Sequence, residues 1–480
     1  MGDINEASDA INGCTLSHNA PHNYLPVPNP TETFWQSEPS VLHDHRTTEE
    51  LPEHSDVVII GAGYSGISTA YHLLKEPSFA GKTITILEAR GACSGATGRN
   101  GGHLRPDLYG HIPTFVERAG DDAGAEVAKF EIEHCFEIKK VIERENIDCD
   151  FTLTRSVDVW CDEESARASK VVFDDLAGKF DYMKDAVFYT GKNVEGICGV
   201  KGAVACATYT AGTMWPYKFI LHLIKGLIAT GRVNLQTHTP ATSMTSYSDA
   251  GVFINTPRGK IHANQVVHAN NAYVAGLLPE YAQNIIPCKG ICCRITVPEG
   301  TIAPLLNDSY INREPNKTLH YLIPRPDGSI IVGGANAIFK HKHQEQWYNN
   351  VDDSVLIDAA KDYYEGYMQR TFRGWENTGA KVDKIWTGVM GYSYDTNPHV
   401  GAVPDRKGQY ILAAWNGHGM PCIWLSGREI AKMVAQGLSF EETCLPRLYK
   451  TTPERISKAQ NGSEDEGDIL TTVASSATKK

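Results

Sequence analysis

The stretch SDVVIIGAGYSGISTAYHLL, residues 55–74, decides the fold of this chain. Its apolar run at 56–60 has the length of a buried strand, and the apolar spacing over 66–75 is typical of a helix. The run TITILE at 83–88 then predicts a second strand. Strand, helix and strand in this order predict a βαβ unit, and therefore an α/β fold with a parallel sheet.

The turn between the first strand and the helix carries the pattern GxGxxG, with Gly61, Gly63 and Gly66. The first glycine permits the tight turn, the second lets a pyrophosphate approach the backbone, and the third lets helix and strand pack closely. Glu88 ends the second strand, where a carboxylate accepts bonds from ribose hydroxyls and repels a 2′-phosphate. The pattern therefore favours FAD or NAD over NADP. The turn and strand end also include Ala62, Tyr64, Ser65, Ala89 and Arg90 as predicted cofactor-binding residues.

A second glycine-rich loop follows the acidic residue, in ARGACSGATGRNGGHLRPD at 89–107. FAD extends beyond the first crevice and needs further backbone amides and close approach, whereas NAD does not require such a loop. The loop therefore favours FAD, with a flexible loop lacking any ligand as the alternative. The predicted cofactor-binding residues of this loop are Gly98, Arg99, Asn100, Gly101 and Gly102.

Composition narrows the class of protein. The 480 residues carry 45 basic and 57 acidic side chains, so the net charge of −12 argues against a nucleic-acid partner. No run reaches the roughly 18 apolar residues of a membrane span, and the first residues lack the features of a secretory signal. We therefore expect a cytoplasmic protein with no membrane partner. The twelve cysteines show no zinc-like spacing, so no metal site is predicted.

Both ends of the chain differ from the middle. Residues 1–54 are rich in Pro, His and Asn without a sustained period, which predicts an extended arm. Residues 452–480 are polar and charged, which predicts a disordered tail. Between them, short runs at 152–160, 251–256, 291–297 and 329–332 are typical of antiparallel strands, and 217–230 is typical of an amphipathic helix.

These motifs together resemble a known family. The glycine fingerprint, Glu88, the GRNGG loop, VVHANNAY at 266–273, WTGVMGYSYDTNPHVGAVP at 386–404 and WNGHGM at 415–420 resemble the D-amino-acid-oxidase-like superfamily of FAD-dependent oxidoreductases. Their order is most similar to the branch of glycine oxidase, sarcosine oxidase and γ-glutamylputrescine oxidoreductase. The resemblance covers roughly residues 55–445.

The resemblance implies a Rossmann-like FAD-binding domain interleaved with a substrate domain whose antiparallel sheet covers the flavin. The FAD domain would be discontinuous, with segments 55–105, 205–275 and 385–445, and the substrate domain would take 106–204 and 276–384. It also implies cofactor contacts near the adenine, the diphosphate and the flavin ring. The residues at these positions are Ala241, Ala269, Asn270, Gly417, His418, Gly419 and Met420.

Three residues are candidates for the chemistry. Arg105 matches an arginine that relatives place beside the flavin, where a positive charge stabilises the reduced anion. His103 would orient substrate or tune the flavin, and Tyr321 would line an aromatic pocket for a cationic amine. The alternatives are a surface arginine, a histidine satisfied by backbone and a tyrosine of the core.

The chain departs from the family pattern at three positions. Met390 stands where relatives with covalent flavin have cysteine, so the resemblance implies noncovalent FAD. Ile331 replaces a lysine that activates dioxygen, so either dioxygen or another acceptor would reoxidise the flavin. Pro421 replaces a lysine that pairs with substrate carboxylate, which favours a larger or uncharged amine over a simple N-methyl amino acid.

The sequence leaves three functions open. The first is oxidation of a carbon–nitrogen bond of a small-molecule amine or amino acid by hydride transfer to flavin. The second is an FAD-binding scaffold or assembly protein without turnover, which the missing lysines allow. The third is a tailoring oxidase of a secondary metabolite.

Overall fold

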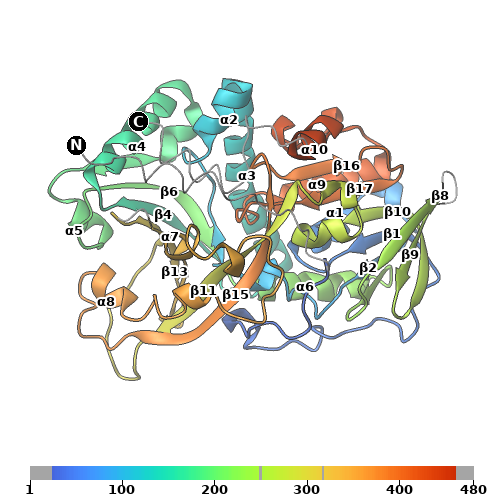
Figure 1. The fold of residues 1–480 in the computed structure, drawn as a ribbon, viewed down its shortest axis with the longest axis horizontal. Helices are drawn as coiled ribbons and strands as arrows, with labels where there is room; N and C mark the ends of the chain where they lie inside the picture. The colour runs from blue at the N-terminus through green and yellow to red at the C-terminus, as the bar shows by residue number, and fades with distance from the viewer. Residues whose placement is uncertain (1–23, 248–250, 316–317, 461–480) are drawn as a thin grey trace, which may run out of the picture.

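Two β-sheets form the framework of the protein. The structure is a computed structural model that describes residues 24–247, 251–315 and 318–460. The two sheets lie side by side in Figure 1, with the long helix α3 (Asp121–Glu145) near the middle of the molecule. Each sheet is assembled from segments far apart in the sequence.

The first sheet contains the predicted βαβ unit. Its strand order is β16-β17-β10-β1-β2-β7, with β9 attached to β10 and β8 to β9. Neighbours from β17 to β7 pair in parallel, whereas β16, β8 and β9 pair antiparallel. The strands are β1 (His54–Ile60), β2 (Ile84–Leu87), β7 (Val233–Gln236), β8 (Ser243–Tyr247), β9 (Gly251–Thr256), β10 (Gly259–His268), β16 (His399–Ala402) and β17 (Gln409–Ala413).

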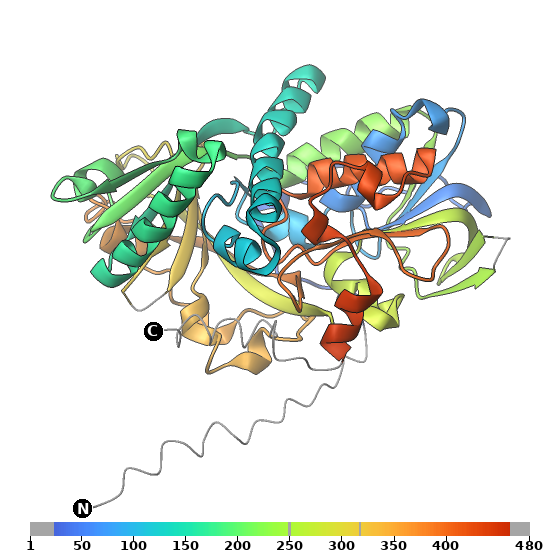
Figure 2. The ribbon, with the colours of Figure 1, turned by 90° about the horizontal axis from the view of Figure 1, so that it is seen from above.

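Helices α1 (Tyr64–Leu73), α6 (Pro216–Ala229) and α9 (Ile423–Gln436) accompany this sheet. Helix α1 contacts both others, and Figure 2 shows α6 and α9 together on one side of the sheet. Close packing depends on Gly427, where an added Cβ would come within 2.1 Å of Ser68 Oγ. Because β1 lies between two strands and beneath these helices, its apolar run is almost wholly buried.

The second sheet has the order β15-β11-β14-β13-β12-β4-β6-β3, with β5 attached to β6. Its pairs are antiparallel except for β4 with β12. The strands are β3 (His103–Leu104), β4 (Thr152–Trp160), β5 (Val187–Thr190), β6 (Ala205–Thr213), β11 (Ile285–Thr296), β12 (Ser309–Arg313), β13 (Leu319–Pro324), β14 (Ile330–Gly334) and β15 (Lys381–Ser393).

The segments that connect the strands of the second sheet contain further helices. Gly120, with φ of +86°, separates α2 from α3, and Asn146 ends α3 in the left-handed conformation. Asp162 caps α4 by accepting a bond from the Ser165 amide at 2.8 Å. The helices are α2 (Ile112–Ala119), α4 (Glu163–Lys179), α5 (Val194–Cys198), α7 (Asn336–Phe339) and α8 (Tyr367–Thr371).

The described part of the predicted N-terminal arm contacts the glycine-rich loop at one point and strand β7 at another. Trp35 is fully buried, and its Nε1 donates to the Asn100 carbonyl at 2.6 Å. Further along, the Thr47 amide donates to the Leu235 carbonyl on β7 at 2.9 Å. Residues 1–23 of the arm lie outside the described part of the chain.

The predicted C-terminal tail differs from expectation over its first residues. Helix α10 (Pro453–Gln460) lies where composition predicts disorder, while 461–480 falls outside the described residues. Arg455 explains the helix, because its guanidinium pairs with Asp395 at 2.6 Å and donates to the Pro398 carbonyl at 3.1 Å. Such a remote partner is not visible in local composition.

The domain boundaries remain a prediction, but the sheets bear on them. Strands β6 and β15 fall in segments that the resemblance gives to the FAD domain, and both pair within the second sheet. The predicted strand at 152–160, β4, pairs antiparallel with β6 but parallel with its other neighbour, β12. Across the described ranges, no helix combines the length and apolarity that crossing a membrane requires.

Candidate active site

The larger cavity lies at the carboxyl ends of β1 and β2, where ligands bind in open parallel sheets. Its volume is about 460 Å³. Most of the predicted cofactor-binding residues line it. They are Gly61, Gly63, Tyr64, Ser65, Glu88, Ala89, Arg90, Asn100, Ala241, Ala269, Asn270, Gly417, Gly419 and Met420.

The glycine turn is shaped by close backbone approach. Gly61 has φ of +110°, and a Cβ there would lie 2.8 Å from the Ala269 carbonyl oxygen. A Cβ on Gly66 would lie 2.0 Å from the Gly61 carbonyl oxygen, so only glycine permits this crossing of strand and helix. The first turn of α1 thus starts at the cavity, and its amides lack intrahelical partners.

Glu88 is held in place by two backbone amides. Its Oε2 accepts from the Ala62 amide and its Oε1 from the Arg90 amide, each at 2.9 Å. A carboxylate has about four lone-pair sites, so both oxygens keep capacity for ribose hydroxyls. The Arg90 guanidinium pairs instead with Asp353 at 2.9 Å and also donates to the Val27 carbonyl of the arm.

A smaller cavity of about 280 Å³ adjoins the larger one. Its walls include the three catalytic candidates, His103, Arg105 and Tyr321, together with Arg99, Gly101 and His418 from the predicted cofactor set. The residues that line both cavities are Ala96, Asn100, Met390, Gly417 and Met420. The glycine-rich loop and the 416–420 loop therefore form the boundary between a nucleotide cavity and a cavity with basic and aromatic walls.

Arg105 is fixed by a buried carboxylate. Its Nη2 donates to both oxygens of Asp158, at 2.9 and 3.1 Å, and its Nε donates to Ser156 Oγ at 3.1 Å. Burial works to lower the pKa of Arg105, but the Asp158 carboxylate outweighs it and raises the pKa above the ordinary value. Arg313 also pairs with Asp158, at 3.3 Å, so two guanidinium groups in the cavity wall share one carboxylate.

His103 and Tyr321 pack edge to face, with ring centroids 5.5 Å apart. His103 Nε2 donates to the Leu322 carbonyl at 3.1 Å, and burial followed by the charge of Arg105 lowers the pKa of His103 to about 4. His103 is therefore neutral at pH 7. Burial raises the pKa of Tyr321, whose hydroxyl lies 3.1 Å from Cys292 Sγ.

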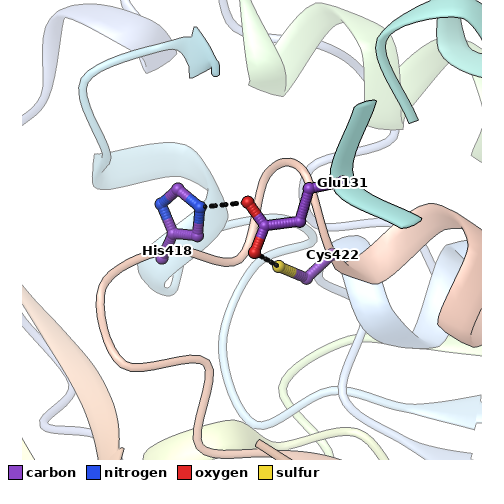
Figure 3. Close-up of side chains that lie close together, drawn as sticks. All are labelled: Glu131, His418 and Cys422. Carbon is purple, nitrogen blue, oxygen red and sulfur yellow. Dashed lines mark hydrogen bonds and ion pairs between the residues drawn. The ribbon is translucent and has the colours of Figure 1, made fainter. Parts of the chain in front are cut away.

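The sequence gives no sign of a cluster behind the 416–420 loop. Figure 3 shows Glu131, from α3, between His418 and Cys422. Glu131 Oε2 lies 2.8 Å from His418 Nε2, and the Cys422 thiol donates to Glu131 Oε1 at 3.5 Å. Glu131 is only 3% exposed. A mid-helix glutamate separated from its partner by 287 positions is found only through the fold.

Four predicted cofactor residues line neither cavity. They are Ala62, Gly66, Gly98 and Gly102. Gly98 lets the second loop close, because a Cβ would lie 2.1 Å from the Cys93 carbonyl oxygen. Gly102, with φ of +77°, approaches the Met214 carbonyl. The sequence also missed contributors to the walls, which include Tyr24, Leu25 and Pro26 of the arm, Tyr273 and Arg313.

Two of the three positions that depart from the family pattern line the cavities, whereas Ile331 lines neither. Met390 borders both cavities, and Pro421 lines the smaller one. Ile331 is fully buried on β14.

The larger cavity fits a dinucleotide by the chemistry of its walls. Three buried polar atoms of residues that line it, the hydroxyls of Tyr24 and Tyr64 and Asn270 Oδ1, have no hydrogen-bond partner within the described part of the chain. Glycines occupy the places where backbone comes closest, and the Glu88 carboxylate stands at the end of β2. These are the groups that would hold the pyrophosphate and ribose of FAD.

Comparison with known proteins agrees with this geometry. Residues 56–433 match the family described as FAD dependent oxidoreductase. The chain is 24% identical over 404 residues to the gamma-glutamylputrescine oxidoreductase of Escherichia coli (strain K12), covering 79% of this chain and 83% of that protein. It is 22% identical over 368 residues to the glycine oxidase of Bacillus subtilis (strain 168), covering 74% and 86%.

Solved structures share the fold. The L-proline dehydrogenase from P. horikoshii superposes with a TM-score of 0.66 at 19% identity, over 86% of this chain and 100% of that one. The glycine oxidase from Geobacillus kaustophilus gives a TM-score of 0.64 at 19% identity, over 84% and 99%. The likeness establishes a common architecture of both sheets.

Proposed function

The chain belongs to the family of FAD-dependent oxidoreductases, and from that premise we propose that it oxidises a carbon–nitrogen bond of an amine or amino-acid-like small molecule. Relatives named gamma-glutamylputrescine oxidoreductase and glycine oxidase support this substrate class. Their identity to this chain is too low to carry over a particular substrate.

The observation that carries the proposal is the junction of the two cavities. The larger cavity, which contains the glycine turn and Glu88, shares part of its wall with the smaller cavity, which Arg105, His103 and Tyr321 line. Asn100 and Met390 border both. A small molecule in the second cavity therefore lies next to whatever occupies the end of the first.

Bound FAD would supply the acceptor for a hydride from the carbon that bears the nitrogen. The protein then has to hold the substrate, exclude water and stabilise negative charge that develops beside the cavity. Arg105 offers a fixed positive charge for this, since Asp158 and Ser156 orient its guanidinium. Tyr321 and neutral His103 offer an aromatic wall against which an amine can pack.

We further propose that FAD is held without a covalent bond. Met390 is a thioether at the position where covalent relatives have a thiol, and thioethers do not form such a link. Acid precipitation should release intact FAD into the supernatant, where its absorbance is measured. Flavin retained on the precipitated chain contradicts this attachment.

The proposed reaction is tested by anaerobic reduction. Purified holoprotein is mixed with a panel of primary, secondary and N-methylated amines and amino acids, and the flavin absorbance is followed. Bleaching by at least one amine, with an imine or carbonyl product in the mass spectrum, is expected. If dithionite bleaches the flavin and no amine does, the proposed reaction is wrong. The alternatives are then an FAD-binding scaffold, which the absence of lysine at Ile331 and Pro421 allows, and a tailoring oxidase of a secondary metabolite.

A further inference from the structure

His418 and Glu131 form a histidine–carboxylate pair in the wall of the smaller cavity. The distance from His418 Nε2 to Glu131 Oε2 is 2.8 Å. The His418 side chain is 28% exposed and that of Glu131 is 4% exposed, so the ring reaches the cavity from a buried anchor. The structure thus combines an accessible imidazole with a carboxylate that is shielded from water.

The partners of Glu131 determine which ring nitrogen carries the proton. Its Oε2 also accepts from the Asp107 amide at 2.7 Å, and its Oε1 accepts from the Cys422 thiol at 3.5 Å. Because Glu131 serves as acceptor for a backbone amide and a thiol, His418 Nε2 must donate to it. The neutral imidazole then has its lone pair on Nδ1.

Nδ1 points to the side of the ring away from Glu131, as Figure 3 shows. Within the described ranges no residue is hydrogen-bonded to it. Its neighbours Gly417 and Met420 line both cavities, and Pro421 lines the smaller one. Among the described residues the lone pair therefore has no partner, and it belongs to a ring that lines the smaller cavity.

We propose that His418 is the base that accepts the ammonium proton of the substrate and that Glu131 is the positioning residue that orients it. This inference rests on the proposed function. An amine reaches the site mainly as its ammonium form, which has no lone pair to stabilise a developing carbon–nitrogen double bond.

The step balances without any further reactant. One N–H bond of the ammonium breaks, its electron pair stays on the amine nitrogen, and the proton moves to His418 Nδ1. Bound FAD would supply the acceptor for the hydride, which carries two electrons from the adjacent carbon as the carbon–nitrogen double bond forms. Glu131 stabilises the resulting imidazolium through the same Nε2 contact, as carboxylates do for catalytic histidines.

Other charged and titratable groups surround this pair. Burial works to raise the pKa of Asp107, but the bond from His111 outweighs it and lowers the pKa. Burial raises the pKa of Cys422 well above the ordinary value, so it stays a thiol and donates. The groups that face the pair are Asp107 and His111 before α2, His134 and Cys135 on α3, Cys422 before α9 and Tyr449.

The test uses the amine that bleaches wild-type holoprotein fastest. His418→Asn should slow anaerobic flavin reduction at pH 7 by about 10²-fold or more, the usual contribution of a general base. The loss should shrink as the pH rises, because the substrate then arrives as free amine. The reduction by dithionite, which needs no base, should keep the wild-type rate.

His238 supplies the matched control. It forms a histidine–carboxylate contact with Asp44 at 2.6 Å and lines neither cavity. His238→Asn should reduce at the wild-type rate at every pH. A His418→Asn protein that reduces as fast as wild type, or that loses the same factor at all pH values, overturns the role as base.

A second variant examines the positioning residue. Glu131→Gln keeps the shape and the acceptor oxygen but removes the charge, so flavin reduction should slow by about tenfold or more with FAD affinity intact. An unchanged rate overturns the role of Glu131. If no amine reduces the wild type, the proposed function fails together with this inference. If the wild type is reduced and His418→Asn behaves identically, this inference alone fails.

Discussion

Glu88 has two roles at the predicted cofactor site: it holds two backbone amides in place, and it presents acceptor oxygens to the cavity. Its two oxygens hold the Ala62 and Arg90 amides, and they line the cavity at the end of β2. Glu88→Ala removes both roles. Hydrogen bonds to a charged group contribute about 1.5–3 kcal/mol, so the dissociation constant of FAD should rise by about one to two orders of magnitude.

Titration of the apoprotein with FAD, followed by fluorescence quenching, measures this effect. Glu88→Gln is the matched control, because it keeps an acceptor oxygen and should lose less affinity than Glu88→Ala. Equal affinity in Glu88→Ala and wild type means that the ribose binds elsewhere.

Arg105 is the second residue whose role can be isolated. In Arg105→Met, Asp158 keeps bonds from Tyr109 at 2.8 Å and Arg313 at 3.3 Å, so the buried carboxylate is not left unpaired. Losing a preorganised positive charge should slow flavin reduction by roughly 10²–10³-fold and lower the midpoint potential, with little change in FAD affinity. Stopped-flow reduction and potentiometry measure both, and Arg105→Lys should recover part of the rate. Reduction of Arg105→Met at the wild-type rate refutes the role.

At the scale of elements, the N-terminal arm joins segments that are remote in sequence. Trp35 packs against Phe34 and Trp215, and it bonds the Asn100 carbonyl of the glycine-rich loop. Trp35→Ala should lower the free energy of unfolding by about 3–5 kcal/mol, as expected for a large aromatic side chain removed from a core.

Denaturant unfolding of the holoprotein measures this loss. Val41→Ala is the control on the same arm, because Val41 is 93% exposed and should change stability by less than about 0.5 kcal/mol. Similar losses in both variants mean that the arm is not part of the core.

The elements predicted correctly are those fixed by local pattern. Helix α6 (Pro216–Ala229) and strand β4 (Thr152–Trp160) match the predicted ranges within a residue, because burial of one face imposes its period on the sequence. The family matched over residues 56–433 confirms the predicted FAD-dependent oxidoreductase. The sequence could not predict contacts between segments that are far apart in the chain. Helix α10 depends on Arg455 meeting Asp395, and no local signal records that pairing.

The candidate site likewise contains residues that local sequence patterns predict and residues that only the fold reveals. The glycine turn and Glu88 can be recognised in the sequence because the close approach of the backbone admits only glycine at the turn, and because a carboxylate is expected at the end of the second strand. Glu131 cannot be recognised in this way, since an acidic residue in an amphipathic helix usually faces solvent, and only packing of α3 behind the 416–420 loop buries it.

For the whole molecule, buried neutral histidines predict sensitivity to acid. Burial lowers the pKa values of His103 and His268 to about 4, and those of His72 and His134 to about 3, from 6.5. The unfolded chain therefore binds more protons below pH 6.5, and stability falls as the pH is lowered from 6.5 toward 4. Each such histidine contributes up to about 1.4 kcal/mol per pH unit in this window.

Denaturant unfolding at pH 7, 6 and 5 should reveal this slope. His268→Gln removes one titrating group that lies in β10, away from the smaller cavity, and should make the slope shallower. His111 acts in the opposite direction: burial works to lower its pKa, but the bond to Asp107 raises it. Stability that is constant from pH 7 to pH 5 contradicts the prediction.

The strand order of the first sheet has a consequence for synthesis on the ribosome. Strand β1 pairs with β10, and β10 pairs with β17. The ribosome makes β17 roughly 350 residues after β1. At about 5–20 residues per second, the early strands wait roughly 20–70 s for their last partner. The loop at 416–420, which borders both cavities, emerges later still. During translation the nascent chain therefore exposes sheet faces to which chaperones can bind, and the flavin site is complete only once the residues through 420 have left the exit tunnel.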